Sequence, residues 1–121
     1  MVVDDDEGIL MLVQAQLRQK GHQVIGAMSG QEALDAVAEK GAPDVVVLDV
    51  GLPDMDGLEL LTALRERLEM PDLAAIFLTG RIEEKDVEAG RALGATYLTK
   101  PFVASAMLAA IERSTPKNET W

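Results

Sequence analysis

The sequence of 121 residues contains no cysteine, few aromatic side chains and few cationic ones. Without cysteine the chain has neither a disulfide framework nor thiol chemistry, which fits a reducing cytoplasm. Aromatic residues make up 3% of the chain, so platforms for stacking nucleobases or flavin rings are nearly absent. The formal net charge of -10 opposes nucleic-acid binding, because affinity for a phosphate backbone rests on Lys and Arg. The sequence therefore predicts a protein that does not bind nucleic acid directly.

Long apolar runs are also missing from the sequence. No run approaches the length needed to cross a membrane, and no cleavable signal is visible. Hydrophobic residues nonetheless make up 48% of the chain, which is enough to build one core and excludes a disordered protein. We therefore expect a single soluble domain in the cytoplasm, with no membrane partner.

What the sequence does contain is a fivefold alternation of short apolar runs with helical patterns. The apolar runs predict strands at residues 1–3, 23–27, 45–48, 74–78 and 95–98. The second helical pattern opens with a capping box from Ser29 to Glu32, and Pro71 ends the third. Five βα units with short connections indicate an α/β fold with a parallel sheet and helices on both faces. Residues 1–113 are assigned to this domain and 114–121 to a polar tail or linker stub.

Polar side chains follow four of the five apolar runs. They are Asp4 and Asp5 after the first run, Asp49 after the third, Thr79 after the fourth and Lys100 after the fifth. The carboxyl ends of parallel strands meet at one edge of the sheet, where ligands bind in such folds. Carboxylates brought together need a cation at neutral pH, and oxygen ligands suit Mg²⁺. Thr79 and Lys100 are then suited to hold phosphoryl oxygens, and Asp49 to act as a nucleophile toward phosphorus.

Each of these residues taken alone has a simpler explanation. The acidic run 4–7 suits a helix N-terminus, Asp49 a turn, Thr79 a helix cap and Lys100 an exposed surface. All of these residues follow the ends of predicted strands, and this shared placement favours one common site. His22 is interpreted as a turn residue without a function.

The sequence resembles the receiver domain of bacterial two-component response regulators, a CheY-like domain. The resemblance rests on the stretches "VVDDDEGI", "VVVLDVGLPDMDGLEL", "FLTG" and "GATYLTKPF", and it extends from Val2 to about Arg113. It implies a flavodoxin-like (βα)₅ fold, a three-layer sandwich with strand order 2-1-3-4-5. It also implies a signalling domain rather than an enzyme, which catalyses only its own phosphorylation and autodephosphorylation.

The resemblance implies a role for each residue of the acidic group. Asp49 becomes the phosphoacceptor. The Mg²⁺ ligands become Asp5, Asp49 and the backbone carbonyl of Gly51, with Asp4 acting largely through water, and Mn²⁺ is the expected substitute. Gly57 is expected to supply a backbone angle that other residues resist.

The resemblance also implies roles in the conformational response to phosphorylation. Thr79 and Lys100 would contact the phosphoryl group, and Tyr97 would turn inward when Thr79 moves. Gly51, two residues after Asp49, and Arg81, two residues after Thr79, are expected to modulate hydrolysis of the acyl phosphate. The peptide bond after Lys100 is expected to be cis.

The implied function is Mg²⁺-dependent phosphotransfer to Asp49 within a phosphorelay. The donor would be a sensor histidine kinase or a phosphotransfer protein. Phosphorylation would change the face built by the fourth helix, fifth strand and fifth helix, through which a homodimer is one expected assembly. The chain is either a single-domain regulator or a receiver excised from a longer protein, and the sequence leaves both readings open.

Some features depart from the family pattern, and other protein classes compete with it. The first strand is short, and the helix predicted at 82–93 contains Gly90, which disfavours helix by ~1 kcal/mol relative to Ala. A Mg²⁺-dependent phosphohydrolase lacks support, because no second Asp follows Asp49 as a general acid and no cap insertion is present. A nucleotide- or flavin-binding module lacks a G-x-G-x-x-G or P-loop. A receiver that serves only for docking is disfavoured by the complete set of site residues.

Overall fold

The computed structural model describes residues 1–80, 84–100 and 104–114. Strands and helices alternate along the chain, as the sequence predicts. The elements are β1 (Val2–Val3), α1 (Glu7–Gln19), β2 (Gly26–Ala27), α2 (Gly30–Lys40), β3 (Val45–Asp49), α3 (Gly57–Leu68), β4 (Ala74–Thr79), α4 (Glu84–Ala92), β5 (Thr96–Thr99) and α5 (Ala104–Ser114).

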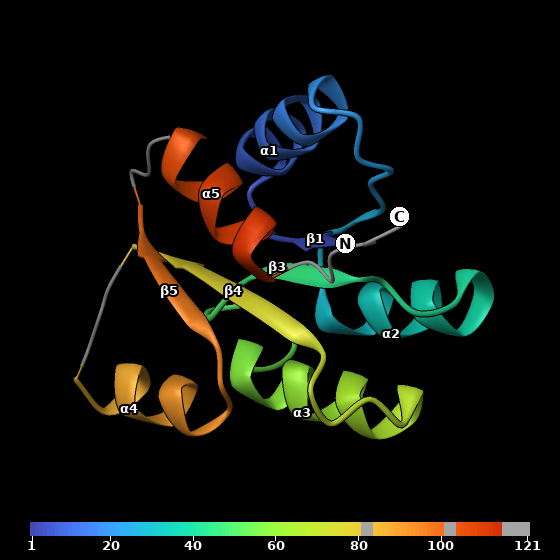
Figure 1. Ribbon diagram of the computed structural model, residues 1–121. Helices are drawn as coiled ribbons and strands as arrows, with labels where there is room; N and C mark the ends of the chain where they lie inside the picture. The colour runs from blue at the N-terminus through green and yellow to red at the C-terminus, as the bar shows by residue number, and fades with distance from the viewer. Residues whose placement is uncertain (81–83, 101–103, 115–121) are drawn as a thin grey trace, which may run out of the picture.

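The five strands form one parallel sheet in the order β2-β1-β3-β4-β5. Helices α1 and α5 cover one face of this sheet, and α2, α3 and α4 lie on the other (Figure 1). The predicted α/β fold and the strand order 2-1-3-4-5 are therefore confirmed. In folds of this type, the site for a ligand lies at the carboxyl ends of the strands.

Neighbouring residues of the central strands pack into two separate aliphatic cores. In β3, Val46 and Leu48 contact the core beneath α2 and α3, whereas Val47 contacts the core beneath α1 and α5. Successive side chains of a strand point to opposite faces, so a strand covered on both sides is apolar throughout. Because β3 is fixed from both faces, the position of Asp49 at its end is also fixed.

The first two strands are short, and the second is shorter than the sequence predicts. β1 is bonded on both sides, since Val2 N donates to Ile25 O at 2.9 Å and Val47 N donates to Met1 O at 2.8 Å. The predicted second strand covered residues 23–27, but only Gly26–Ala27 are paired as a strand, with Val2 and Val3. The short β1 offers no further residues to pair with, which limits β2.

The N-terminal turn of α2 shows the predicted capping box in a shifted form. Ser29 Oγ accepts a hydrogen bond from Glu32 N at 3.1 Å, as predicted. The Glu32 carboxylate accepts from Met28 N at 2.7 Å, one residue before the amide that a standard box uses. Asp6 and Asp56 are the N-caps of α1 and α3.

The C-terminal ends of α3 and α5 differ slightly from the predicted boundaries. α3 ends at Leu68, before the predicted stop at Pro71, and Glu69 adopts a left-handed conformation with φ of 53°. α5 extends to Ser114, and residues 115–121 lie outside the described residues. The division into a domain and a tail stays a prediction. Among the described helices, none is long and apolar enough to cross a membrane.

Arg65 on α3 connects this helix to the residue before β4 and to the residue after α4. Its Nε and Nη2 donate to Leu73 O at 3.2 and 2.8 Å, and its Nη1 donates to Leu93 O at 2.6 Å. Leu93 follows α4 directly, at a helix end where carbonyl groups lack intrahelical donors and a cation is favoured. Burial lowers the pKa of the Arg65 guanidinium, which nonetheless stays charged at neutral pH. Arg65 thus stabilises the packing of α4 beside α3.

The substitution Arg65→Met should lower the free energy of unfolding by about 2 kcal/mol, because three hydrogen bonds from a charged group are lost. Urea unfolding monitored by circular dichroism measures this. Arg67→Met is the matched control, since Arg67 is exposed on the same helix and its loss should change stability by less than about 0.5 kcal/mol. Equal effects of the two substitutions would contradict the stabilising role of Arg65.

Candidate functional site

Three carboxylates gather where β1 and β3 end. Asp4 and Asp5 follow β1, and Asp49 is the last residue of β3. One carboxylate oxygen from each lies within 4.8 Å of the others, a spacing that can hold a metal ion. Asp4 is 1% exposed, whereas Asp49 is partly buried and Asp5 is exposed. The structure thus brings together the three carboxylates that the sequence predicts at this edge.

Lys100 completes the cluster from the end of β5. Its Nζ lies 2.7 Å from Asp4 Oδ2 and 3.1 Å from Asp49 Oδ2. Its backbone amide donates to Thr79 O at 2.7 Å, which fixes the lysine relative to β4. The ends of β1 and β3 therefore meet at the Lys100 ammonium, and the end of β4 is bonded to the backbone of the same residue.

The charges of this cluster do not balance. Burial raises the pKa of Asp4, against the effect of the hydrogen bond from Lys100. Burial acts to lower the pKa of Lys100, but its hydrogen bonds to Asp4 and Asp49 outweigh burial and raise it. The ammonium is therefore charged at neutral pH. One cation shared among three carboxylates leaves a surplus of negative charge, which suits a divalent cation with oxygen ligands.

Asp4 is the most buried of the three carboxylates and accepts hydrogen bonds on both oxygens. Asp4 Oδ1 accepts from Asp6 N at 2.9 Å, and Asp4 Oδ2 accepts from Lys100. Both oxygens already have protein donors. Asp49 likewise has a donor on each oxygen, Gly51 N and Lys100 Nζ, so burial and not hydrogen bonding distinguishes Asp4 from Asp5 and Asp49. The indirect role of Asp4 toward a metal stays a prediction.

The loop after β3 runs from Val50 to Asp56 and is called the β3–α3 loop. Its Gly51 amide donates to Asp49 Oδ1 at 3.1 Å, and Gly57 N donates to Val50 O at 2.7 Å. A Cβ at Gly57 would overlap the Asp49 carbonyl group. Gly57 is not among the residues with positive φ, so the expected unusual backbone angle is wrong. The glycine is required there by the close approach of two backbone segments.

Of the predicted switch residues, Thr79 is bonded to Lys100 through its carbonyl, and Tyr97 lies three residues before Lys100 in β5. Thr79 ends β4 and is 6% exposed. Tyr97 in β5 is half-buried and stacks on Phe77 of β4, with ring centroids 5.0 Å apart. Arg81 and the peptide bond from Lys100 to residue 101 fall outside the described residues, so the expectations about them stay predictions.

Gly90 has a structural role that sequence reasoning missed. The Tyr97 ring lies against the backbone of α4 at this position, and a Cβ on Gly90 would overlap the ring. The sequence shows a glycine only as a weak point in a helix, and nothing local relates it to a tyrosine seven residues later. Gly90 thus provides the space in which Tyr97 packs.

The substitution Gly90→Ala should displace the Tyr97 ring even though alanine favours helix by ~1 kcal/mol. The expected result is a weakened or lost contact between the Phe77 and Tyr97 rings, measured by nuclear Overhauser effects. Glu88→Ala is the control, because Glu88 is exposed on the same helix and its change also favours helix. Identical Tyr97 ring signals in Gly90→Ala and the unchanged protein would contradict this packing.

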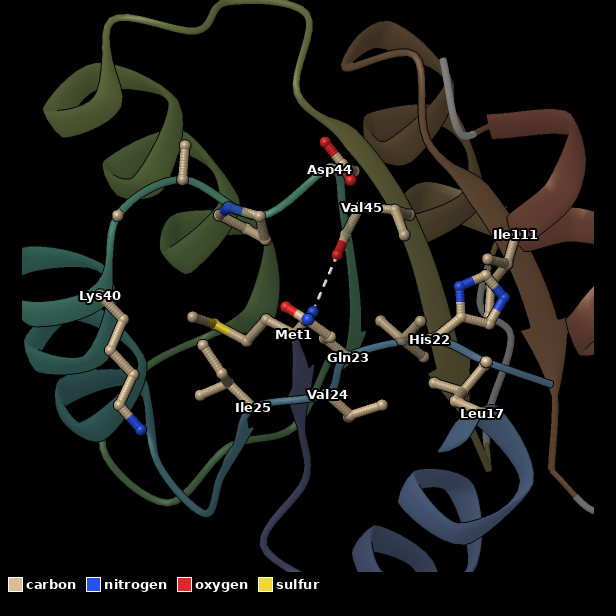
Figure 2. Close-up of a pocket in the computed structure, with 15 residues that line it drawn as sticks. Met1, Leu17, His22, Gln23, Val24, Ile25, Lys40, Asp44, Val45 and Ile111 are labelled. Atoms are coloured by element: carbon tan, nitrogen blue, oxygen red, sulfur yellow. Dashed lines mark hydrogen bonds between the residues drawn. The ribbon is translucent and has the colours of Figure 1, made fainter. Parts of the chain in front are cut away.

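A cavity of about 570 Å³ is lined by residues that include Met1, His22, Lys40, Asp44 and Ile111 (Figure 2), and no residue of the acidic cluster is part of this lining. It lies beside the amino ends of β1 and β3. The Met1 amino group donates to Val45 O at 3.0 Å, and burial lowers the pKa of this amine to about 6. The chemistry predicted from the strand ends is therefore separate from this cavity.

The fold and the position of the cluster define a doubly wound α/β domain with its site at the carboxyl edge of the sheet. The family model of the response regulator receiver domain matches residues 1–112. The chain belongs to this family and is a receiver domain of two-component response regulators.

Two curated relatives are about twice as long as this chain. It is 46% identical over 103 residues to the alkaline phosphatase synthesis transcriptional regulatory protein PhoP of Bacillus subtilis, covering 84% of this chain and 42% of that protein. It is 41% identical over 119 residues to the transcriptional regulatory protein KdpE of Mycobacterium tuberculosis, covering 98% of this chain and 51% of that protein. The chain spans about half the length of these curated relatives.

Solved structures agree with the family assignment. The chemotaxis protein CheY4 of Vibrio cholerae matches with a TM-score of 0.85 and 32% identity, covering 93% of this chain and 94% of that one. The non-phosphorylated HemR receiver domain of Leptospira biflexa matches with a TM-score of 0.84 and 30% identity, covering 99% and 95%. The BeF3-activated DrrB receiver domain matches with a TM-score of 0.81 and 36% identity, covering 93% and 92%. The fold is thus the CheY-like receiver fold.

Proposed function

We propose that Asp49 accepts a phosphoryl group from the phosphohistidine of a sensor histidine kinase or a phosphotransfer protein, in a reaction that requires Mg²⁺. The observation that carries this proposal is the cluster of Asp4, Asp5 and Asp49 around the Lys100 ammonium. The cytoplasm is the compartment that we propose, because a chain without cysteine suits a reducing environment.

The metal would be held by Asp5, Asp49 and the Gly51 carbonyl, with Asp4 acting through water. Bound there, Mg²⁺ supplies charge neutralisation for the phosphoryl oxygens. The donor set fits this ion, since it consists of oxygen atoms and carries surplus negative charge. Mn²⁺ has the same ligand preference and is a substitute.

In the proposed reaction, the protein positions the reacting groups and stabilises their charge. A carboxylate oxygen of Asp49 attacks phosphorus, the bond from phosphorus to the donor histidine nitrogen breaks, and an acyl phosphate forms. The Asp49 carboxylate is oriented for this by Gly51 N on one oxygen and by Lys100 on the other. After transfer, the Lys100 ammonium neutralises the new phosphoryl oxygens.

The proposed response to phosphorylation is a change of the face formed by α4, β5 and α5. The Thr79 hydroxyl moves toward the phosphoryl group, and Tyr97 follows. Two contacts support this route: Lys100 N bonds to Thr79 O, and the Tyr97 ring packs on α4 at Gly90. The changed face then binds a partner or a second copy of this chain, so the domain acts as a two-state signal. It turns over its own acyl phosphate, which Gly51 and Arg81 modulate, and no external substrate.

Intact mass spectrometry after incubation with acetyl phosphate tests the phosphoacceptor. One phosphoryl adduct is expected with Mg²⁺, and none with EDTA or in Asp49→Asn, because the reaction needs both the metal and this carboxylate. Asp35→Asn, an exposed change on α2, should retain the adduct. An adduct that persists in Asp49→Asn or in EDTA would refute the proposal, provided that circular dichroism shows each variant to be folded.

The substitution Lys100→Met tests the role of the ammonium. Removal of this cation leaves the carboxylates with more negative charge, so Mg²⁺ should bind about tenfold more tightly. Phosphorylation by acetyl phosphate should nevertheless become slower, because the phosphoryl oxygens lose a cation. Titration calorimetry and the rate of adduct formation measure the two effects, with Lys40→Met as an exposed control. A variant that binds Mg²⁺ more weakly than the unchanged protein would contradict this role.

A further inference from the structure

The β3–α3 loop is held at its base and at its tip. At the base, Gly51 and Asp56 form an antiparallel bridge. At the tip, the Asp54 carboxylate accepts two hydrogen bonds from the first turn of α2. Gly30 N donates to Asp54 Oδ1 and Gln31 N donates to Asp54 Oδ2, each at 2.9 Å. The tip of the loop is therefore attached to a helix that begins more than twenty residues earlier in the chain.

These two hydrogen bonds satisfy amides that α2 cannot pair by itself. The first four N–H groups of a helix lack intrahelical acceptors. The side chain of the N-cap Ser29 accepts from Glu32 N, and Asp54 accepts from the Gly30 and Gln31 amides. A carboxylate is also favoured at a helix N-terminus. The hydrogen bonds from Gly30 and Gln31 lower the pKa of Asp54, so the carboxylate is ionised at neutral pH.

A second contact supports the same attachment. The Met55 side chain covers the backbone of Gly30, and a Cβ on Gly30 would overlap its sulfur and neighbouring carbons. Gly30 is buried in spite of its position in the first turn of the helix. The tip of the loop thus contacts α2 through one ionic and one apolar side chain.

The loop in turn orients the proposed phosphoacceptor. Gly51 lies between Asp49 and the tip of the loop, and its amide donates to Asp49 Oδ1 at 3.1 Å. The other oxygen of Asp49 is held by Lys100. A displaced loop would therefore move one of the two donors that fix the carboxylate, and with it the Gly51 carbonyl.

We propose that Asp54 is a positioning residue for phosphorylation, which acts by attaching the β3–α3 loop to the first turn of α2. This inference rests on the proposed function of Asp49 and extends it to α2, outside the face formed by α4, β5 and α5. Asp54 itself touches neither metal nor phosphoryl group. Because coupling between two sites is reciprocal, Mg²⁺ binding also stabilises the hydrogen bonds of the Gly30 and Gln31 amides.

Three variants of the full chain test the proposal. Asp54→Ala removes both hydrogen bonds, and Asp54→Asn keeps one acceptor oxygen for Gly30. Ser29→Ala is the matched control, because it removes another acceptor from the same turn and leaves the loop attached. Asp54→Ala should weaken Mg²⁺ binding and slow phosphorylation by acetyl phosphate, each by about fivefold. Asp54→Asn should have an intermediate effect on both Mg²⁺ affinity and phosphorylation rate. Ser29→Ala should keep both within about twofold of the unchanged protein. Equal effects of Asp54→Ala and Ser29→Ala would overturn the proposal.

A spectroscopic measurement separates this inference from the proposed function. In ¹H–¹⁵N spectra without metal or phosphodonor, Asp54→Ala should shift the Gly51 amide and Ser29→Ala should not. An unchanged Gly51 amide would overturn the positioning role even if the unchanged protein is phosphorylated. A missing phosphoryl adduct in the unchanged protein would instead refute the proposed function, and the Gly51 amide would still decide the role of Asp54. If Asp54→Ala is unfolded, Asp54→Asn gives the same two measurements.

Discussion

The contact of the Lys100 ammonium with Asp4 and Asp49 is the interaction on which the functional edge depends. It joins the ends of β1, β3 and β5, which are far apart in the sequence. The strand order 2-1-3-4-5 brings these ends to one edge of the sheet, with β4 between β3 and β5. Such a buried ion pair is a weak source of stability, because desolvation offsets its attraction. In the proposed function, its value lies in holding the nucleophilic carboxylate beside a cation, so that the phosphoryl group contacts both.

The two aliphatic cores explain how this edge stays rigid. Strand β3 is buried from both faces, and the strands beside it are packed in the same way. Close-packed interiors resist gradual deformation. In the proposed function, charge added at the edge is therefore transmitted through the loops and the surface helices, which can move against the cores.

The sequence predicts the fold and the membership of the site well, because both follow from local patterns. Apolar runs mark the strands, and the polar residues Asp49, Thr79 and Lys100 stand at their ends. Contacts between distant segments could not be predicted in this way. Asp54 looks like a turn residue, and its bonds to α2 exist only after folding. Likewise, Gly90 is explained by the ring of Tyr97 and not by its own helix. The length of β2 also depends on a partner, since a strand extends only as far as its neighbour.

The hydrogen bond from Arg65 to Leu93 has a mechanical consequence for α4. It fixes the chain directly after the C-terminal end of the helix to α3, and Gly90, two residues before the last residue of the helix, rests on the Tyr97 ring. Both contacts lie at the C-terminal end of α4, so the helix behaves as a lever whose pivot is close to its fixed end. A small rotation of the ring would then be amplified along α4 away from Leu93, with its largest displacement at the end that begins at Glu84.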